Sequence, residues 1–176
     1  MSVFISGGCK NGKSFCAQRI AKALGTPLYY IATMIPHDGE DTARIARHRA
    51  ERVGWGFETL EQGRDILKCL DRADPRGAFL LDSVTALLAN EMFDADGFHP
   101  EAPEKIAAEL TDFVERAPNI VLVSDFIYAD AAFYDPMTEA YRRALAHIDR
   151  ALAACCDCVL EIVGGCPILH KGVTRL

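Results

Sequence analysis

The sequence lacks the features of membrane, secreted and nucleic-acid-binding proteins. No apolar run reaches the length that a transmembrane helix needs, because charged residues or glycines interrupt every long candidate. The N-terminus has no basic stretch followed by an apolar signal segment. The net charge of −6 gives no general attraction to nucleic acid or to an anionic membrane. We therefore expect a cytoplasmic protein whose partners include neither nucleic acid nor a membrane.

Internal repeats, low-complexity segments and interdomain linkers are also missing. The 176 residues are 50% hydrophobic, which is typical of a globular chain with a sizeable core. This length and composition predict one domain over residues 1–176.

The seven cysteines do not form an obvious metal or disulfide pattern. An odd number in a cytoplasmic chain indicates free thiols. A zinc site is the alternative, drawn from Cys155, Cys156, Cys158, Cys166 and His170. However, the apolar run 159–163 predicts a buried strand that would carry Cys158 and Cys166 to opposite ends of a sheet. We therefore expect most of the cysteines to be small buried hydrophobes.

One stretch near the N-terminus fits the phosphate-binding P-loop, G-x-x-x-x-G-K-[ST]. An apolar strand is predicted before it, over residues 2–6, and a helix after it, over residues 15–24. Glycines let the backbone direct N–H groups at phosphate oxygens, Lys13 should reach the β- and γ-phosphates, and Ser14 should hold Mg²⁺. The alternative, a glycine-rich turn with a chance Lys-Ser, is disfavoured by these flanking elements. The expected phosphate-binding residues are Gly7, Gly8, Cys9, Lys10, Asn11, Gly12, Lys13 and Ser14.

Polar residues also end three other predicted strands. Thr33, Asp82 and Asp125 follow the apolar runs 28–32, 78–81 and 119–124. Strands alternate with helices, which predicts an α/β fold with a mostly parallel sheet and helices on both faces. Such sheets bind ligands at the carboxyl ends of their strands. Asp82 has the position of a Walker B carboxylate that orders Mg²⁺; an acid that merely ends a strand is the alternative, and the P-loop favours the former.

A basic helix is predicted from a cap at Asp41 or Thr42 to about Arg52. Arg44, His48 and Arg52 recur at every fourth position, so they share one face of this helix. Composition alone favours a solvated basic helix with an ordinary surface histidine.

Together these motifs resemble the bifunctional adenosylcobinamide kinase/adenosylcobinamide-phosphate guanylyltransferase family of cobalamin biosynthesis. The P-loop is common to many families, but residues 44–52, Arg-Ile-Ala-Arg-His-Arg-Ala-Glu-Arg, are similar to the far more specific R-I-x-x-H-[RK]-x-x-R of this family. The further matching segments are residues 30–33, 59–61, 80–83 with Asn90, and 165–171.

The resemblance implies a RecA-like P-loop NTPase fold and two reactions. ATP or GTP would phosphorylate the aminopropanol hydroxyl of an adenosylcobinamide-type corrinoid, and GMP would then pass from GTP to that phosphate. It implies His48 as the nucleophile of a GMP-histidine intermediate, Lys13 as a catalytic cation, Mg²⁺ held by Ser14 and Asp82, and a homotrimer. Besides the P-loop, the nucleotide-binding positions implied are Ala32, Thr33, Met34, Arg49, Ala50, Glu51, Arg52, Glu61 and Asp82.

The second half of the chain departs from the pattern of this family. The family's V-[ST]-N-E-V-G is replaced by Val-Ser-Asp-Phe-Ile-Tyr at residues 123–128, and Asp149 stands where an asparagine is usual. Two alternatives therefore remain beside the bifunctional enzyme. One is a P-loop kinase or nucleotidyltransferase with a different acceptor, and the other is a nucleotide-binding regulator, which would not need a histidine within an arginine-rich segment.

Overall fold

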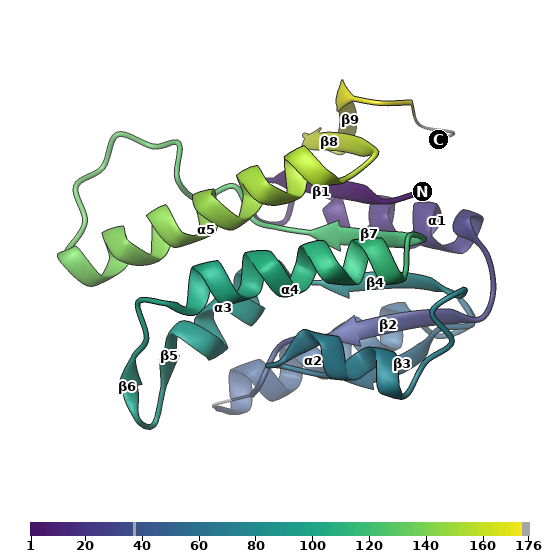
Figure 1. Cartoon of the computed structure of the whole chain (residues 1–176), viewed down its shortest axis with the longest axis horizontal. Coiled ribbons are helices and arrows are strands. Elements are labelled where there is room, and N and C mark those ends of the chain that lie inside the picture. Colours follow the sequence, from purple (N-terminus) through teal and green to yellow (C-terminus); the bar gives the residue numbers. More distant parts are fainter. Residues whose placement is uncertain (37, 174–176) are drawn as a thin grey trace.

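The computed structural model describes residues 1–36 and 38–173, and a seven-stranded sheet runs through the middle of it (Figure 1). The strand order is β3-β2-β4-β7-β1-β8-β9, and every neighbouring pair is parallel except β8 and β9. The mostly parallel α/β sheet predicted from the alternation of strands and helices is thus confirmed. The strands are β1 (Val3–Gly7), β2 (Leu28–Ala32), β3 (Glu58–Glu61), β4 (Ala78–Asp82), β7 (Ile120–Val123), β8 (Cys158–Val163) and β9 (Cys166–Lys171).

Helices cover both faces of this sheet. The helix α1 packs on one face, and α3, α4 and α5 pack on the other, where they lie in front of the strands in Figure 1. Within residues 1–36 and 38–173, no helix combines the length and the apolar character needed to cross a membrane. The helices are α1 (Lys13–Leu24), α2 (Gly39–Glu51), α3 (Val84–Met92), α4 (Ala102–Arg116) and α5 (Pro136–Cys155), with a 3₁₀ helix, η1 (Ile66–Asp71).

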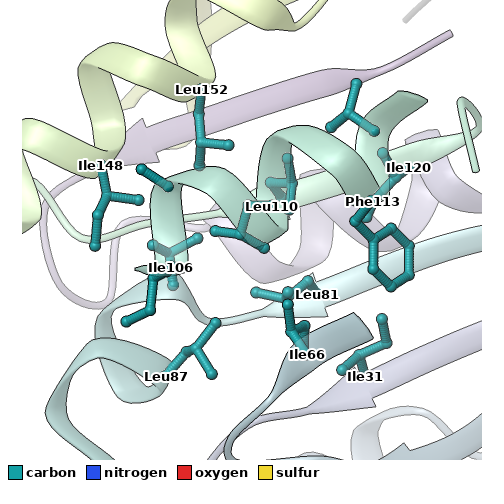
Figure 2. Packing of buried hydrophobic residues seen from close by; sticks show 14 of the residues in the cluster. Ile31, Ile66, Leu81, Leu87, Ile106, Leu110, Phe113, Ile120, Ile148 and Leu152 are labelled. Atoms are coloured by element: carbon teal, nitrogen blue, oxygen red, sulfur yellow. The ribbon is translucent and has the colours of Figure 1, made fainter. Parts of the chain in front are cut away.

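The larger core lies between the sheet and α3, α4 and α5 (Figure 2). The Phe79 ring of β4 meets the Phe113 ring of α4 edge to face, with 5.3 Å between centroids. Leu110 and Leu152 bring α4 and α5 into the same cluster. Because both faces of β4 and β7 are covered, these strands are apolar at nearly every position, which is why their sequences show no alternation.

On the opposite face, α1 packs through small side chains. Ala17 and Ala21 are fully buried, in the same cluster as Ile5 of β1 and Val121 of β7. Small residues let the helix lie close to the sheet, so the start of α1 lies directly at the end of β1. This geometry places the P-loop at the edge where the parallel strands end.

One local prediction is wrong in detail. The cap of α2 is Asp38, whose carboxylate accepts a hydrogen bond from Asp41 N at 2.8 Å, rather than Asp41 or Thr42. Residues 66–71 form the 3₁₀ helix η1. The acidic segment after α3 contains the short hairpin β5 (Phe93–Asp94) and β6 (Gly97–Phe98). The hairpin turn forms because Asp94 Oδ1 accepts hydrogen bonds from Asp96 N and Gly97 N.

The C-terminal hairpin keeps the cysteines apart. Cys166 pairs with Val163 at the far end of β8 from Cys158, as the sequence predicts. In the described part of the chain all seven cysteines are free, and no group of three or more Cys, His, Asp or Glu is arranged to hold a metal. The zinc alternative therefore has no support.

Candidate active site

The P-loop connects β1 to α1 in a conformation that its glycines make possible. Gly12 has φ of 87°, in the left-handed region that favours glycine, and it caps α1. A Cβ on Gly7 would lie 2.6 Å from Ile162 O of β8, so a larger residue would push β1 and β8 apart. The Asn11 amide donates to Ile162 O and accepts from Gly164 N, which ties the loop to the β8–β9 turn. The sequence indicated the loop but not this anchor.

Lys13 lies in this loop with its side chain only 7% exposed. Its ammonium donates to Gly8 O at 2.6 Å and lies 2.8 Å from Asp125 Oδ1. A buried lysine at the start of a helix, where the first backbone N–H groups have no intrahelical partner, is a preorganised cation for a polyphosphate. The partner Asp125 follows β7, which lies between β1 and β4.

Asp82 ends β4 next to the start of α1. Its Oδ2 accepts hydrogen bonds from Ser14 Oγ at 3.1 Å and from Tyr30 OH at 2.9 Å. A hydroxyl and a carboxylate oxygen that converge in this way are the donors that Mg²⁺ takes from a protein when phosphates and water supply the remaining ligands. Ser14 and Asp82 therefore fit Mg²⁺. Tyr30 was not expected here, because nothing in its local sequence indicates that it points at Asp82.

Thr33, which follows β2, forms hydrogen bonds with Ser83, the residue that follows the neighbouring strand β4. Its hydroxyl accepts from Ser83 N at 2.7 Å and donates to Ser83 O at 2.8 Å. Asn90 of α3 donates to Thr33 O at 2.7 Å and to Gly63 O at 2.9 Å. Thr33 thus fixes the position of Asp82 and of its own neighbours, Ala32 and Met34, at the same edge.

The basic helix α2 reaches this edge through its last residues. The Arg52 guanidinium lies 3.5 Å from the centre of the Tyr30 ring, and Tyr30 in turn binds Asp82. Arg49 forms an ion pair with Glu61 of β3. Arg49 and Arg52 also line a hollow of about 440 Å³ together with Thr59. Arg52 is therefore joined through Tyr30 to Asp82 at the candidate Mg²⁺ position.

His48 is partly exposed on α2, one turn before Arg52. Ala50 is exposed on the same helix. The side chains of Arg44, predicted on the same helix face as His48, and of Glu51, one of the implied nucleotide-binding positions, lie outside the part of the structure that is described. Of the predicted residues, the structure thus brings the P-loop, Asp82 and Arg52 together, and it places Arg49 and Glu61 at the outer edge of the sheet, on α2 and β3.

A buried carboxyl lies next to the residue that follows β7. Asp149 of α5 is 3% exposed, and its Oδ2 accepts hydrogen bonds from Ser124 at 3.0 Å and Tyr128 at 2.9 Å. Among the residues described, its Oδ1 has no hydrogen-bond partner. Burial, with a smaller contribution from the charge of Asp125, raises the pKa of Asp149 to about 7. The only sequence signal for this cluster was the departure at residues 123–128 and 149.

The fold and site define a P-loop nucleotide-binding protein. Among solved structures, the chain resembles an ATPase domain, with a TM-score of 0.52 at 10% identity, covering 91% of this chain and 68% of that one. It also resembles a protein from Pyrococcus horikoshii OT3, with a TM-score of 0.56 at 10% identity, covering 99% and 87%. At such low identity these likenesses show the fold alone.

The family follows from the sequence relatives. Residues 3–169 match the family described as cobinamide kinase / cobinamide phosphate guanyltransferase. The chain is 30% identical to the bifunctional adenosylcobalamin biosynthesis protein CobP of Pseudomonas aeruginosa, over 98% of each chain. It is 28% identical to CobU of Escherichia coli, described in the same words, over 97% of this chain and all of the relative. The chain belongs to the cobinamide kinase / cobinamide phosphate guanyltransferase family.

Replacing the carboxylate at the candidate Mg²⁺ position tests that assignment. Asp82→Asn keeps the shape and the hydrogen bonds to Ser14 and Tyr30 but removes the charge that attracts Mg²⁺. We expect nucleotide binding in the presence of Mg²⁺ to weaken on the order of 10-fold or more, with a melting temperature close to that of the parent. Titration calorimetry with and without Mg²⁺ measures the first effect. A lower melting temperature with unchanged binding would instead make Asp82 a structural carboxylate.

The raised pKa of Asp149 leads to a separate prediction about how the stability of the fold depends on pH. Asp149 is protonated in the folded protein up to a pKa of about 7, whereas in the unfolded chain it ionises near 3.8. Between these values the folded state binds the extra proton, so stability falls as pH rises and levels off above 7. Asp149→Asn has no carboxyl to ionise and so does not lose this stability. The free energy of unfolding of the variant, relative to that of the parent, should therefore increase from pH 4 to pH 7.

The difference between about 7 and 3.8 limits this gain to about 4 kcal/mol. Denaturant unfolding of both proteins at several pH values measures it. The hydrogen bonds of the replaced side chain add only a constant offset, so a difference between the two proteins that does not change with pH would contradict the raised pKa.

Proposed function

We propose that this chain is a bifunctional transferase of cobalamin biosynthesis that phosphorylates adenosylcobinamide and then transfers GMP from GTP to the phosphate. The observation that carries the proposal is the link between two chemically different centres. The P-loop with Lys13 is joined through Ser14, Asp82 and Tyr30 to Arg52, which directly follows the helix that carries His48. A phosphoryl-transfer centre and a histidine among arginines on one sheet edge suit a two-step transferase.

In the first reaction, the P-loop would hold the triphosphate of ATP or GTP. Backbone N–H groups at the start of α1 would bind phosphate oxygens, and Lys13 would offset the charge that develops as the γ-phosphoryl group transfers. Ser14 and Asp82 would hold Mg²⁺, which neutralises phosphate charge when it is bound. Thr33 supports this step indirectly, since it fixes Ser83 and with it the end of β4.

In the second reaction, His48 would attack the α-phosphorus of GTP and release pyrophosphate. A neutral imidazole is a competent nucleophile near pH 7, and a covalent intermediate divides one difficult transfer into two easier ones. Arg49 and Arg52 line the hollow at the end of α2, where a triphosphate needs cations. Ala50 and Glu61 belong to the same region of α2 and β3, and they would border the nucleotide there.

The assembly proposed for this activity is a single-domain subunit, residues 1–176, in a homotrimer located in the cytoplasm, where ATP and GTP are made. Its support is the resemblance to the family and the exposed edge of the sheet, because all six residues of β9 are exposed, including Ile168 and Leu169. Sedimentation equilibrium tests the trimer: a monomer at micromolar concentration would contradict it.

Labelled GTP tests the proposed function directly. The protein is incubated with GTP labelled at the α-phosphate, without acceptor, and the protein is separated and tested for bound label. A phosphoramidate on histidine is labile in acid and stable in base, and it should then pass to cobinamide phosphate when that acceptor is added. Transfer of γ-phosphate from ATP to cobinamide tests the first reaction. Phosphorylation of a different hydroxyl compound in preference to cobinamide would favour the alternative acceptor.

A further inference from the structure

Tyr30 lies between the candidate Mg²⁺ position and the end of α2. It belongs to β2 and pairs with Leu80 of β4, two residues before Asp82, so the side chains of Tyr30 and Asp82 project from the same face of the sheet. The Tyr30 hydroxyl donates to Asp82 Oδ2 at 2.9 Å. The Arg52 guanidinium lies 3.5 Å from the centre of the Tyr30 ring. One side chain therefore contacts a residue of each proposed reaction.

The contact between Tyr30 and Arg52 is shielded from water. Tyr30 is 4% exposed and Arg52 is 8% exposed. The Phe57 ring meets the Tyr30 ring edge to face, with 5.8 Å between centroids, which restricts movement of the Tyr30 ring. A cation over an aromatic ring is held more strongly when both are desolvated. Because Arg52 also lines the hollow at the end of α2, the Tyr30 ring fixes where a positive charge borders that hollow.

The neighbouring tyrosine shows what a purely structural tyrosine does in the same strand. Tyr29 is 6% exposed, and its ring stacks on the Phe79 ring with 5.0 Å between centroids. Its hydroxyl accepts a hydrogen bond from Asp74 N, in the turn that precedes β4. The Tyr29 hydroxyl thus has a backbone partner at the start of β4, whereas the Tyr30 hydroxyl binds a carboxylate at the end of β4, where ligands bind.

We propose that Tyr30 is a positioning residue for both reactions of the bifunctional transferase. Its hydroxyl orients the Asp82 carboxylate that would hold Mg²⁺. Its ring holds the Arg52 guanidinium beside the hollow, where that cation would offset charge on the α-phosphate of GTP. Tyr30 acts through these two residues and not on a substrate. This inference rests on the proposed function, and the three residues lie outside the segments in which the chain departs from the family.

The hydroxyl contact can be removed alone. Tyr30→Phe keeps the ring that Arg52 contacts and removes the hydrogen bond to Asp82. Losing a hydrogen bond to a metal-binding side chain lowers metal affinity roughly 10- to 100-fold, so the Mg²⁺ concentration that half-saturates nucleotide binding should rise about 10-fold. The rate of covalent labelling by α-labelled GTP at saturating Mg²⁺ should stay close to that of the parent, because the contact that holds Arg52 remains.

The ring contact is removed by a second variant. Tyr30→Leu keeps an apolar side chain in the core but has neither the hydroxyl nor the ring. It should show the same change in Mg²⁺ dependence and, in addition, the partial loss of labelling expected of Arg52→Ala. Combining Tyr30→Leu with Arg52→Ala should slow labelling no further than Arg52→Ala alone, because the ring acts through the guanidinium. Losses that add in the double variant would show that the ring does not act through Arg52.

Three measurements on the whole chain test the proposal. They are calorimetric titration with a non-hydrolysable ATP analogue at several Mg²⁺ concentrations, the rate of labelling by α-labelled GTP at saturating Mg²⁺, and the melting temperature. Tyr29→Phe and Tyr29→Leu are the matched controls, since they make the same changes in the same strand away from Asp82 and Arg52. The controls should change the melting temperature without changing Mg²⁺ dependence or labelling.

The outcomes separate the possible failures. If Tyr30→Phe keeps the Mg²⁺ dependence of the parent, or if Tyr30→Leu is labelled as fast as the parent, the proposal is wrong. It is also wrong if the Tyr29 variants reproduce both effects, because a weakened strand would then explain them. A parent that is neither labelled by GTP nor able to phosphorylate cobinamide would overturn the proposed function itself, and the shared role of Tyr30 would fail with it.

Discussion

Lys13→Ala is expected to lower the rate of phosphoryl transfer on the order of 10²-fold or more. The ammonium is buried, and its contacts with Gly8 O and Asp125 hold it in place before nucleotide binds. A cation fixed in a site of low dielectric stabilises developing phosphate charge more than a solvated cation does. Its removal also leaves the Asp125 carboxylate without its ion-pair partner beside the loop that would hold phosphate, so nucleotide binding should weaken as well.

Lys68→Ala is the control for this variant. Lys68 is exposed on η1 and pairs with Asp65, so its loss removes the same charge from a surface ion pair that contributes little to stability. Single-turnover measurement of γ-phosphate transfer and calorimetry of nucleotide binding compare the three proteins. If Lys13→Ala bound and turned over nucleotide like the parent, the stretch 7–14 would be a glycine-rich turn rather than a P-loop.

The parts of the site that the sequence predicted are those with local signals. The P-loop can be recognised in the sequence from the spacing of its glycines before Lys13 and Ser14, because residues adjacent in the chain build the whole phosphate loop. Asp82 was predicted because an acid directly follows an apolar run, and buried parallel strands form such runs. These same patterns predict a mostly parallel α/β sheet but not the order of its strands, since which strands are neighbours depends on packing.

The parts that were missed depend on contacts between distant segments. Tyr30 reads as one more apolar strand residue, and only the pairing of β2 with β4 brings its hydroxyl to Asp82. The contact between Lys13 and Asp125 joins residues that are far apart in the sequence and meet because β1 and β7 are neighbours. Asp149 looks like a surface acid on an amphipathic helix, and its burial follows from how α5 crosses the sheet.

His48→Ala is expected to abolish both covalent guanylylation of the protein and transfer of GMP to the acceptor, while phosphorylation of the acceptor continues. The two reactions should separate because Lys13, Ser14 and Asp82 do not depend on the imidazole. Loss of a nucleophile removes the covalent route entirely, whereas loss of a neighbouring cation only slows it. Arg52→Ala should therefore give a partial loss of labelling, which makes it the graded comparison.

His147→Ala is the matched control, since it removes an imidazole from α5, on the other side of the sheet. The assay follows acid-labile label from α-labelled GTP alongside γ-phosphate transfer from ATP in all four proteins. Label that persists on His48→Ala would mean that another residue is the nucleophile. An equal loss of both activities would make His48 part of a general nucleotide site, because a nucleophile that serves one reaction has no chemical reason to support the other.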